Sequence, residues 1–119
     1  GLAAARAAPG DELMRDGVIQ RFEYTYELSH KSLRRSLEET EPAPEAIREL
    51  SFPGLIRLGA ERGLLRNSWD VWTDHRKARG TTSHTYDSAK AAEVFARIPA
   101  FLEDARALLA ALEARVTTS

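Results

Sequence analysis

The stretch SAKAAEVFARIPAFLEDARALLAALEAR, residues 88–115, decides the fold. Its apolar residues recur in alternating steps of four and three, the repeat with which long helices pack against each other in a bundle. Pro99 lies inside the repeat, and we expect it to bend the helix without ending it. A second apolar row, Val94, Phe101 and Leu108, widens the stripe. The repeat itself consists of Ala91, Phe95, Ile98, Leu102, Ala105, Leu109, Leu112 and Val116.

The rest of the chain also carries helical patterns and lacks the alternation typical of strands. We expect helices over residues 11–40, 44–63 and 68–80, the second one broken at SFPG (51–54) because proline lacks a backbone donor. These segments predict an all-α fold, an antiparallel up-and-down four-helix bundle. A single domain is expected over residues 1–119, with its core at about 11–116. The expected buried stripe of the first helix is Met14, Val18, Phe22, Tyr26, Leu33 and Leu37.

The composition narrows the class of protein. The formal net charge of the 119 residues is −1, so no global field attracts the chain to nucleic acid or to a membrane, and any polyanion site must be local. No run approaches the ~18 apolar residues of a membrane span. The absence of cysteine excludes disulfides and thiolate metal sites and fits a reducing compartment. We therefore expect a cytoplasmic protein with no membrane partner.

The wide apolar stripe of residues 88–115 has two interpretations. It leaves apolar surface for a partner, which predicts a homodimer. The alternative, a wide core face within one chain, follows equally well from the pattern.

The chemistry of the sequence gathers in DHRKARGTTSHTYDS, residues 74–88. Arg79 and His84 are five apart and would face apart on an unbroken helix, but Gly80 and the following Thr-Thr-Ser are expected to disturb the helix and let them converge. Arginine offers a fixed fork of donors to a phosphate, and histidine transfers protons near neutral pH. Such a pair suits RNA cleavage without a metal, and a dimer would supply two pairs. The competing interpretation is an Arg and a His that cap helix ends and pair with acids.

Other charged groups of the chain form two basic patches and one acidic pair. Arg76 and Lys77, beside Arg79, form a candidate RNA- or phosphate-binding patch, with a solvated face as the alternative. Glu23 and Glu27 are expected to pair with Arg79 from a facing helix. A second basic group, Lys31 with its neighbours Arg34 and Arg35, is expected to be a solvated face.

We predict no metal and no cofactor. A metal site of Asp74, His75 and His84 would need adjacent helical residues to point the same way, and no clean set of three or four ligands is present. The sequence also lacks a Gly-rich phosphate loop and the Gly-Ser with distal paired Asp of a nucleotidyltransferase active site. The chain is therefore not expected to catalyse nucleotide transfer itself.

Several segments together resemble one family. RGTTSHTYD has the form Arg-x4-His-x-Tyr of HEPN-type proteins, and RDGVIQRFEYTYELSHKSL (15–33) resembles the first core helix of the nucleotidyltransferase substrate-binding, or HepT-like, family. FPGLIRLG and the later tryptophan pair follow in that family's order. The resemblance covers roughly residues 13–112.

The resemblance implies a dimeric four-helix bundle that associates with a minimal nucleotidyltransferase in a toxin–antitoxin-like pair. In such a pair this chain would be the RNase toxin, with Arg79 and His84 at the catalytic positions. The partner would silence it by transferring AMP to Tyr86. An older interpretation of the family makes the chain the non-catalytic substrate-binding subunit of a two-component nucleotidyltransferase.

Two positions depart from the family pattern. Gly80 stands where the family often has a polar residue, commonly Asn, so a side chain that could orient the site is missing. His30 stands where the family often has Trp, and we expect it to be a surface substitution, with a second imidazole near the site as the alternative.

Overall fold

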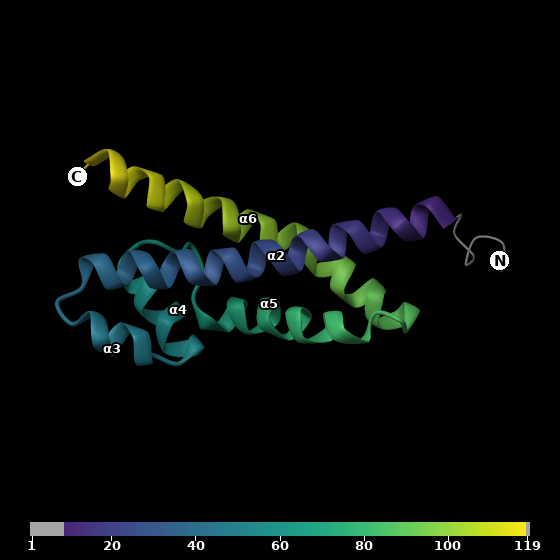
Figure 1. The fold of residues 1–119 in the computed structure, drawn as a ribbon, viewed down its shortest axis with the longest axis horizontal. Coiled ribbons are helices and arrows are strands. Elements are labelled where there is room, and N and C mark those ends of the chain that lie inside the picture. The colour runs from purple at the N-terminus through teal and green to yellow at the C-terminus, as the bar shows by residue number, and fades with distance from the viewer. Residues whose placement is uncertain (1–8, 119) are drawn as a thin grey trace.

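The computed structural model describes the backbone of residues 9–118 and the side chains of residues 12–116, and every regular element in that range is helical. Figure 1 shows α5 running back against α2, and α6 returning in the direction of α2. The short α3 and α4 together occupy the place of the second helix, which confirms the predicted all-α bundle. The elements are α2 (Pro9–Thr40), α3 (Pro44–Glu49), α4 (Phe52–Glu61), α5 (Trp69–Thr81), the 3-10 turn η1 (Thr82–His84) and α6 (Ser88–Thr118).

Prolines and a glycine set the boundaries of the short helices. Pro44 begins α3, and Pro53 lies in the first turn of α4, where a missing N–H costs nothing. The Ser51 hydroxyl caps α4 by accepting the backbone N–H of Gly54 at 3.2 Å, which satisfies one of the donors that a helix start leaves free. Gly63 adopts φ +75° just after α4, a backbone conformation that ends helices and favours glycine.

One aromatic cluster holds the three long helices together. Phe22 of α2 packs edge-on against Phe101 of α6 with ring centroids 5.0 Å apart, and Trp72 of α5 reaches Phe101 at 6.0 Å. All three side chains are buried, and each contributes about 1.5–3 kcal/mol by leaving water. The cluster fixes how α2, α5 and α6 meet.

The predicted stripe of the first helix is wrong at its N-terminal end. Met14 is 71% exposed and Val18 is 37% exposed, whereas Ile19 is buried at 3%. Phe22, Tyr26, Leu33 and Leu37 are buried as expected. In Figure 1 the first turns of α2 extend past the crossing with α6, and there α6 approaches α2 on another face, where Arg15 lies over the ring of Phe95.

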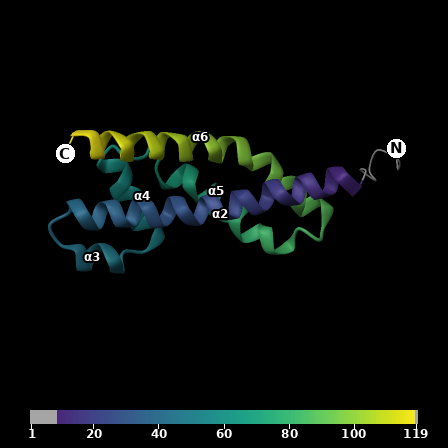
Figure 2. The same ribbon diagram turned by 45° about the horizontal axis from the view of Figure 1, so that its top comes forward.

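The long last helix buries only part of the row expected to be its centre, since Ala91 and Ile98 of that row are buried. Val94 and Phe101 are fully buried, whereas Phe95 and Leu109 of the four-three repeat are 43% and 57% exposed. The core face therefore combines the row that was expected only to widen the stripe with two members of the repeat, Ala91 and Ile98. Pro99 lies inside α6, which bends part-way along its length without ending (Figure 2), as expected for a proline within a long helix.

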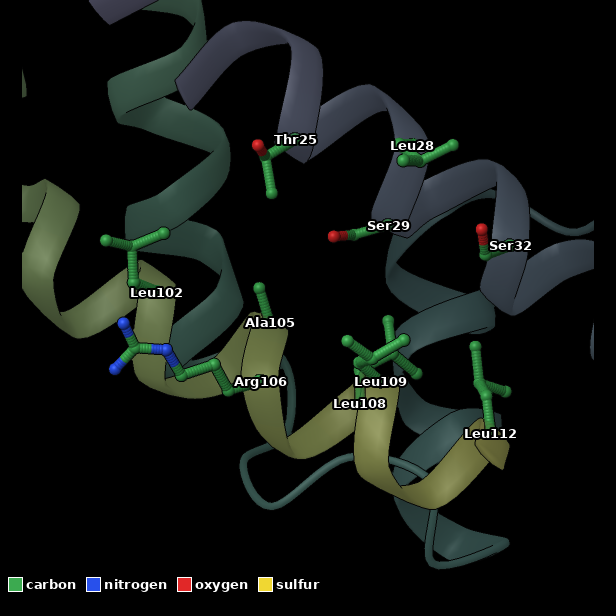
Figure 3. A pocket seen from close by; sticks show the side chains of 10 residues that line it. All are labelled: Thr25, Leu28, Ser29, Ser32, Leu102, Ala105, Arg106, Leu108, Leu109 and Leu112. Atoms are coloured by element: carbon green, nitrogen blue, oxygen red, sulfur yellow. The ribbon is translucent and has the colours of Figure 1, made fainter. Parts of the chain in front are cut away.

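The exposed part of the repeat lines a groove of about 230 Å³ between α2 and α6 (Figure 3). Leucines of α6, including Leu109 and Leu112, form one wall, and small hydroxyl residues of α2 form the other. The C-terminal end of α6 is tied to α2 by Arg115, whose Nη1 donates to the Ser36 hydroxyl at 3.0 Å. Within residues 9–118, no helix combines the length and the apolar character that crossing a bilayer requires.

Candidate functional site

The turn between α5 and α6 carries the histidine and the tyrosine of the Arg-x4-His-x-Tyr segment. Hydroxyl groups there donate to carbonyl oxygens three residues earlier, at 2.6, 3.0 and 3.3 Å, and so tighten the end of the helix into the 3-10 turn η1. These hydroxyls belong to Thr82, Ser83 and Thr85. The predicted disturbance of the helix after Gly80 is therefore confirmed.

Asp87 caps the last helix, which begins at Ser88. Its backbone N–H donates to the carbonyl of His84 at 3.1 Å, and its carboxylate accepts the N–H of Ala89 at 2.9 Å. A carboxylate in this position satisfies a backbone donor that the helix leaves free. His84 and Tyr86 are consequently presented on a short turn between two helices.

Arg79 is held by two carboxylates of α2, as the sequence predicts. Its Nε donates to Oε1 of Glu27 at 3.2 Å, and its Nη1 lies 3.6 Å from Oε2 of Glu23. Nη1 also donates to the hydroxyl of Thr82 at 2.9 Å. The guanidinium is about one-third exposed, so it is oriented and partly neutralised but still reaches solvent.

His84 is not engaged in the same way. It is exposed, and no hydrogen bond joins it to Arg79 among the residues that the structure describes. Its ring lies edge-on to Tyr86 with centroids 6.1 Å apart. The turn therefore places the imidazole beside the phenol, and Arg79 lies at the α2 side of the same turn.

Tyr86 is the most exposed large apolar side chain of the described residues, at 87%. It lines a shallow hollow of about 320 Å³ with residues of α2, including Gln20 and Glu23. Glu23 is also a partner of Arg79, so one carboxylate touches both the Tyr86 hollow and the arginine. The phenol is accessible to a second protein.

Arg76 and Lys77 face different sides of α5. The guanidinium of Arg76 covers the rings of Phe52 and Trp69, at 5.5 and 6.0 Å from their centroids. Lys77 instead lines a hollow with Glu93 and other residues of α6. The structure does not bring these two cations together into one patch.

Within residues 12–116, no group of three or more metal-ligating side chains is placed to hold a metal ion. His75, one of the three residues considered for a metal, is fully buried and turned away from the motif. Its Nε2 lies 2.6 Å from Oδ2 of Asp104 on α6. His75 therefore belongs to a hydrogen-bond network outside the Arg-x4-His-x-Tyr segment.

That network was not predicted. Asp104 is 2% exposed and accepts from three groups, since Oδ1 takes a hydrogen bond from Nε of Arg66 at 2.6 Å and from Nδ2 of Asn67 at 2.7 Å. Nδ1 of His75 accepts from Nε of Arg97 at 3.1 Å. A signal did exist: His75 follows the buried Trp72 by three residues, the spacing of one helix face.

The bonding fixes the protonation of His75. Since Arg97 can only donate, Nδ1 must be the unprotonated acceptor and Nε2 must carry the hydrogen that points to Asp104. Burial lowers the pKa of His75, and the charge of Arg97 lowers it further against the opposing effect of Asp104. The hydrogen bond from His75, with those from Arg66 and Asn67, holds the pKa of Asp104 below its usual range although burial opposes this.

His30 is a half-buried packing residue and not a surface substitution. Its ring contacts Phe52 at a centroid distance of 4.6 Å, and Nη2 of Arg34 lies 3.3 Å from its Nε2. Arg34 is not solvated as expected either, because its Nη1 donates to the carbonyls of Ile47 at 2.6 Å and Leu50 at 3.2 Å. It thereby satisfies carbonyl groups at the end of α3.

Comparison with known proteins places this arrangement in a family. The model of the family described as nucleotidyltransferase substrate binding protein like matches residues 1–114. The chain belongs to this nucleotidyltransferase substrate-binding family. The expectation drawn from the first helix and the Arg-x4-His-x-Tyr segment is confirmed.

Similar members of the nucleotidyltransferase substrate-binding family come from Haemophilus influenzae. One, named probable ribonuclease HepT, is 37% identical over 99 residues, which are 83% of this chain and 67% of the relative. A solved structure, HI0074, matches with a TM-score of 0.81 and 36% identity over 85% of this chain and 74% of the other. It is described as revealing the fold of a substrate binding domain of a nucleotidyltransferase.

Proposed function

We propose that this chain is the HEPN-type partner of a minimal nucleotidyltransferase and is itself a metal-independent RNase, a toxin that the partner silences by transferring AMP to Tyr86. The observation that carries the proposal is the position of Tyr86. Its phenol is 87% exposed on the turn before α6, and its ring lies 6.1 Å from that of His84. An acceptor for a transferred nucleotide must be accessible to the second enzyme, and a nucleotide placed there covers His84. A cytoplasmic location, expected from the cysteine-free sequence, suits an RNA substrate.

Cleavage would proceed by attack of a ribose 2′-hydroxyl on the adjacent phosphorus, which breaks the bond to the 5′-oxygen of the next nucleotide. His84 would transfer one of the two protons, from the 2′-hydroxyl or to the leaving 5′-oxygen, and water would serve the other. Arg79 would stabilise the charge of the phosphorane oxygens. Arg76 and Lys77 are proposed to contact RNA phosphates outside the reacting bond.

The AMP group on Tyr86 would silence RNA cleavage through its negative charge and its size. In the step that the partner catalyses, the Tyr86 oxygen attacks the α-phosphorus of ATP, the phenol loses its proton and pyrophosphate leaves. Tyr86 lines one hollow with Glu23, and Glu23 pairs with Arg79. A phosphodiester at Tyr86 would therefore compete with RNA for the same arginine.

A second candidate function is a non-catalytic substrate-binding subunit of a two-component nucleotidyltransferase. Arg79 is already paired with two carboxylates, and among the described residues no side chain holds the His84 ring in one tautomer. Gly80 supplies no side chain to do so. These observations suit a chain that docks an enzyme and presents Tyr86 without cutting RNA.

We also propose that the chain forms a homodimer through the groove between α2 and α6. Leu28 and Leu109 remain half-exposed at the groove, which Leu109 lines with Leu102 seven residues earlier. A seven-residue apolar repeat suits packing against helices of a second copy. Thr25 lines the groove on a different face of α2 from Glu23, because residues two apart point to nearly opposite sides of a helix. This interface therefore leaves Arg79 uncovered and does not by itself bring two Arg79–His84 pairs together.

The proposal is tested by cleavage of a mixed RNA pool in the presence of a chelator. The parent chain, free of modification at Tyr86 by mass spectrometry, is compared with His84→Ala, Arg79→Ala and Tyr86→Phe. We expect the parent and Tyr86→Phe to cleave and the other two to lose at least about a hundredfold in rate. Incubation with the partner nucleotidyltransferase and ATP should add AMP to the parent, abolish its cleavage and leave Tyr86→Phe active. A folded, unmodified parent that leaves RNA intact favours the binding-subunit function instead.

A further inference from the structure

A basic hollow of about 340 Å³ lies along α2, starting at Glu27, which also holds Arg79. We call it the α2 hollow, and it is lined by Glu27, His30, Lys31, Arg34, Arg35 and Glu38. The two acids among these residues are each paired with an arginine from outside the hollow. Glu27 pairs with Arg79 at 3.2 Å, and Glu38 pairs with Arg48 at 3.8 Å. The positive charges of the lining are therefore not neutralised by its own carboxylates.

Lys31 is the cation with the greatest freedom to bind a ligand. It is exposed, and within residues 12–116 it makes no ion pair or hydrogen bond. Arg35 reaches Glu39 at 3.7 Å, but both side chains are largely exposed, and such pairs are weak. Arg34 donates hydrogen bonds to carbonyl groups at the end of α3, and its positive charge remains beside the hollow.

Arg76 of α5 adds a preorganised fork of donors. Its guanidinium lies over Phe52 and Trp69, and within the described part of the chain no carboxylate lies within ion-pair distance. Stacking on aromatic faces fixes the plane of the group and leaves its N–H edges free. The ring of His30, which lines the α2 hollow, contacts the same Phe52 at 4.6 Å, so Arg76 lies beside the hollow on the other side of this ring pair.

The electrostatics of His30 agree with this geometry. Burial is the main cause that lowers the pKa of His30, and the positive charges of Arg34, Arg76 and Lys31 lower it further, against Glu27 alone. These charged groups come from α2 and α5, and α4 faces the imidazole with Phe52. The positive charges around His30 therefore outweigh the one carboxylate that opposes them.

We propose that the α2 hollow binds a phosphate group, with Lys31 of its lining and the neighbouring Arg76 as the donors. The site adjoins Arg79 through Glu27 but includes neither Arg79 nor His84, and it does not depend on whether the chain cleaves RNA. Two sources carry the required chemistry, a nucleotide such as AMP and the backbone of a single strand. A single strand would also reach the motif, because Gln20 lines the Tyr86 hollow and Lys31 lies only three helical turns further along α2.

The test is a titration of the isotope-labelled full chain, followed by two-dimensional NMR at constant ionic strength. The probes are inorganic phosphate, AMP and a single-stranded oligodeoxynucleotide, which lacks the 2′-hydroxyl and cannot be cleaved by the proposed reaction. We expect shifts centred on Lys31, Arg76 and the indole of Trp69. Lys31→Gln and Arg76→Gln should each weaken binding about three- to tenfold. Arg57 is an exposed residue of α4 that does not line the hollow. Arg57→Gln removes its charge and should leave the affinity unchanged.

Comparison of the three probes also identifies the source of the phosphate. If a strand is bound, the oligodeoxynucleotide binds more tightly than AMP, and each variant reduces the slope of log affinity against log salt by about 0.7. If a nucleotide is bound, AMP binds at least as tightly as the strand. The proposal is overturned if none of the probes shifts these residues, or if all three variants weaken binding equally. The cleavage assay depends on the Arg79→Ala and His84→Ala variants and this titration depends on Lys31→Gln and Arg76→Gln, so the two proposals fail separately.

Discussion

The Nε2 atom of His75 lies 2.6 Å from Oδ2 of Asp104, and both side chains are buried. This contact joins α5 to α6 one helical turn before Arg79. Arg66 and Asn67, in the loop before α5, donate to the other oxygen of the same carboxylate. A single buried acid thus fixes the position of the helix that carries the candidate catalytic arginine.

Replacing Asp104 by alanine should destabilise the fold strongly. The substitution leaves the buried Nε2–H of His75 and the donors of Arg66 and Asn67 without their acceptor. Breaking a buried charged network in this way costs about 3–5 kcal/mol. Urea unfolding followed by circular dichroism measures the difference.

The neighbouring acid provides the control for this substitution. Glu103 is more than half exposed and pairs with Arg106 at 3.4 Å within one helix. Glu103→Ala should change stability by about 0.5 kcal/mol or less. Equal effects at the two positions would show that the network around Asp104 contributes nothing beyond a surface acid.

Stability should fall as pH drops below about 6.5. The folded state keeps His75 and His30 neutral, with pKa values lowered from the ordinary 6.5, whereas the unfolded chain protonates both near that value. The unfolded state then binds more protons, so acid favours it by up to about 1.4 kcal/mol per pH unit for each histidine. Asp104 has an ordinary pKa of 3.8 in the unfolded chain and leaves this window unaffected.

Urea midpoints at pH 7.5, 6.5 and 5.5 test this dependence. His30→Gln, which removes one of the two groups, should reduce the slope without abolishing it. A urea midpoint that stays constant across this pH range would contradict the conclusion that His75 is buried in its neutral form.

Glu27→Gln should strengthen RNA binding. Glu27 holds Nε of Arg79 at 3.2 Å, so a phosphate must compete with this carboxylate for the guanidinium. Loss of the negative charge removes that competition, and we expect affinity to rise about two- to fivefold, measured by fluorescence anisotropy with a labelled oligonucleotide. Glu61→Gln, an exposed change on α4, controls for net charge. Weaker binding by Glu27→Gln would mean that the carboxylate positions Arg79 for RNA and does not compete with it.

Gly80→Ala should stabilise the protein by about 0.5 kcal/mol, because a glycine within a helix costs roughly that much relative to alanine. Gly80 lies in α5 with ordinary helical backbone, and a Cβ there would meet no atom within 4 Å. The same open space admits Gly80→Asn, so the side chain common in the family can be restored and its effect on cleavage measured.

Gly63→Ala is the matched comparison, because φ at this position is +75°. There the substitution should destabilise by about 1 kcal/mol. Chemical denaturation should therefore show that Gly80→Ala raises the free energy of unfolding and Gly63→Ala lowers it. Changes of the same sign would contradict the different backbone conformations of the two glycines.

Leu109→Glu should convert the proposed homodimer to a monomer without unfolding it. Leu109 is 57% exposed and lines the groove between α2 and α6. A carboxylate there is solvated in the monomer but buried without a partner in the dimer. Light scattering after gel filtration measures the mass. Ala110→Glu, one residue away on the exposed side of α6, should remain dimeric. A parent chain that is monomeric at high concentration would refute the interface.

Local sequence patterns located the helices, their breaks and the chemical motif. Pro44, Pro53 and Gly63 act through their own backbone, and the hydroxyl residues after Gly80 act on carbonyls only three residues away. The pairing of Arg79 with Glu27 was also predictable, because it needs only two opposite charges on helices that must face each other.

The tertiary structure decided which residues of two overlapping apolar rows in residues 88–115 became the core. Both rows satisfy the helical repeat, and only the placement of α2 and α5 buries Val94 and Phe101 while leaving Leu109 exposed. It also decided the role of His75, whose partner Asp104 lies 29 residues away and is an ordinary surface acid by local pattern. The sequence by itself determined the helices and the family, because those depend on neighbours along the chain. Burial and charge pairing depend on neighbours in space, and these arise only when the helices pack.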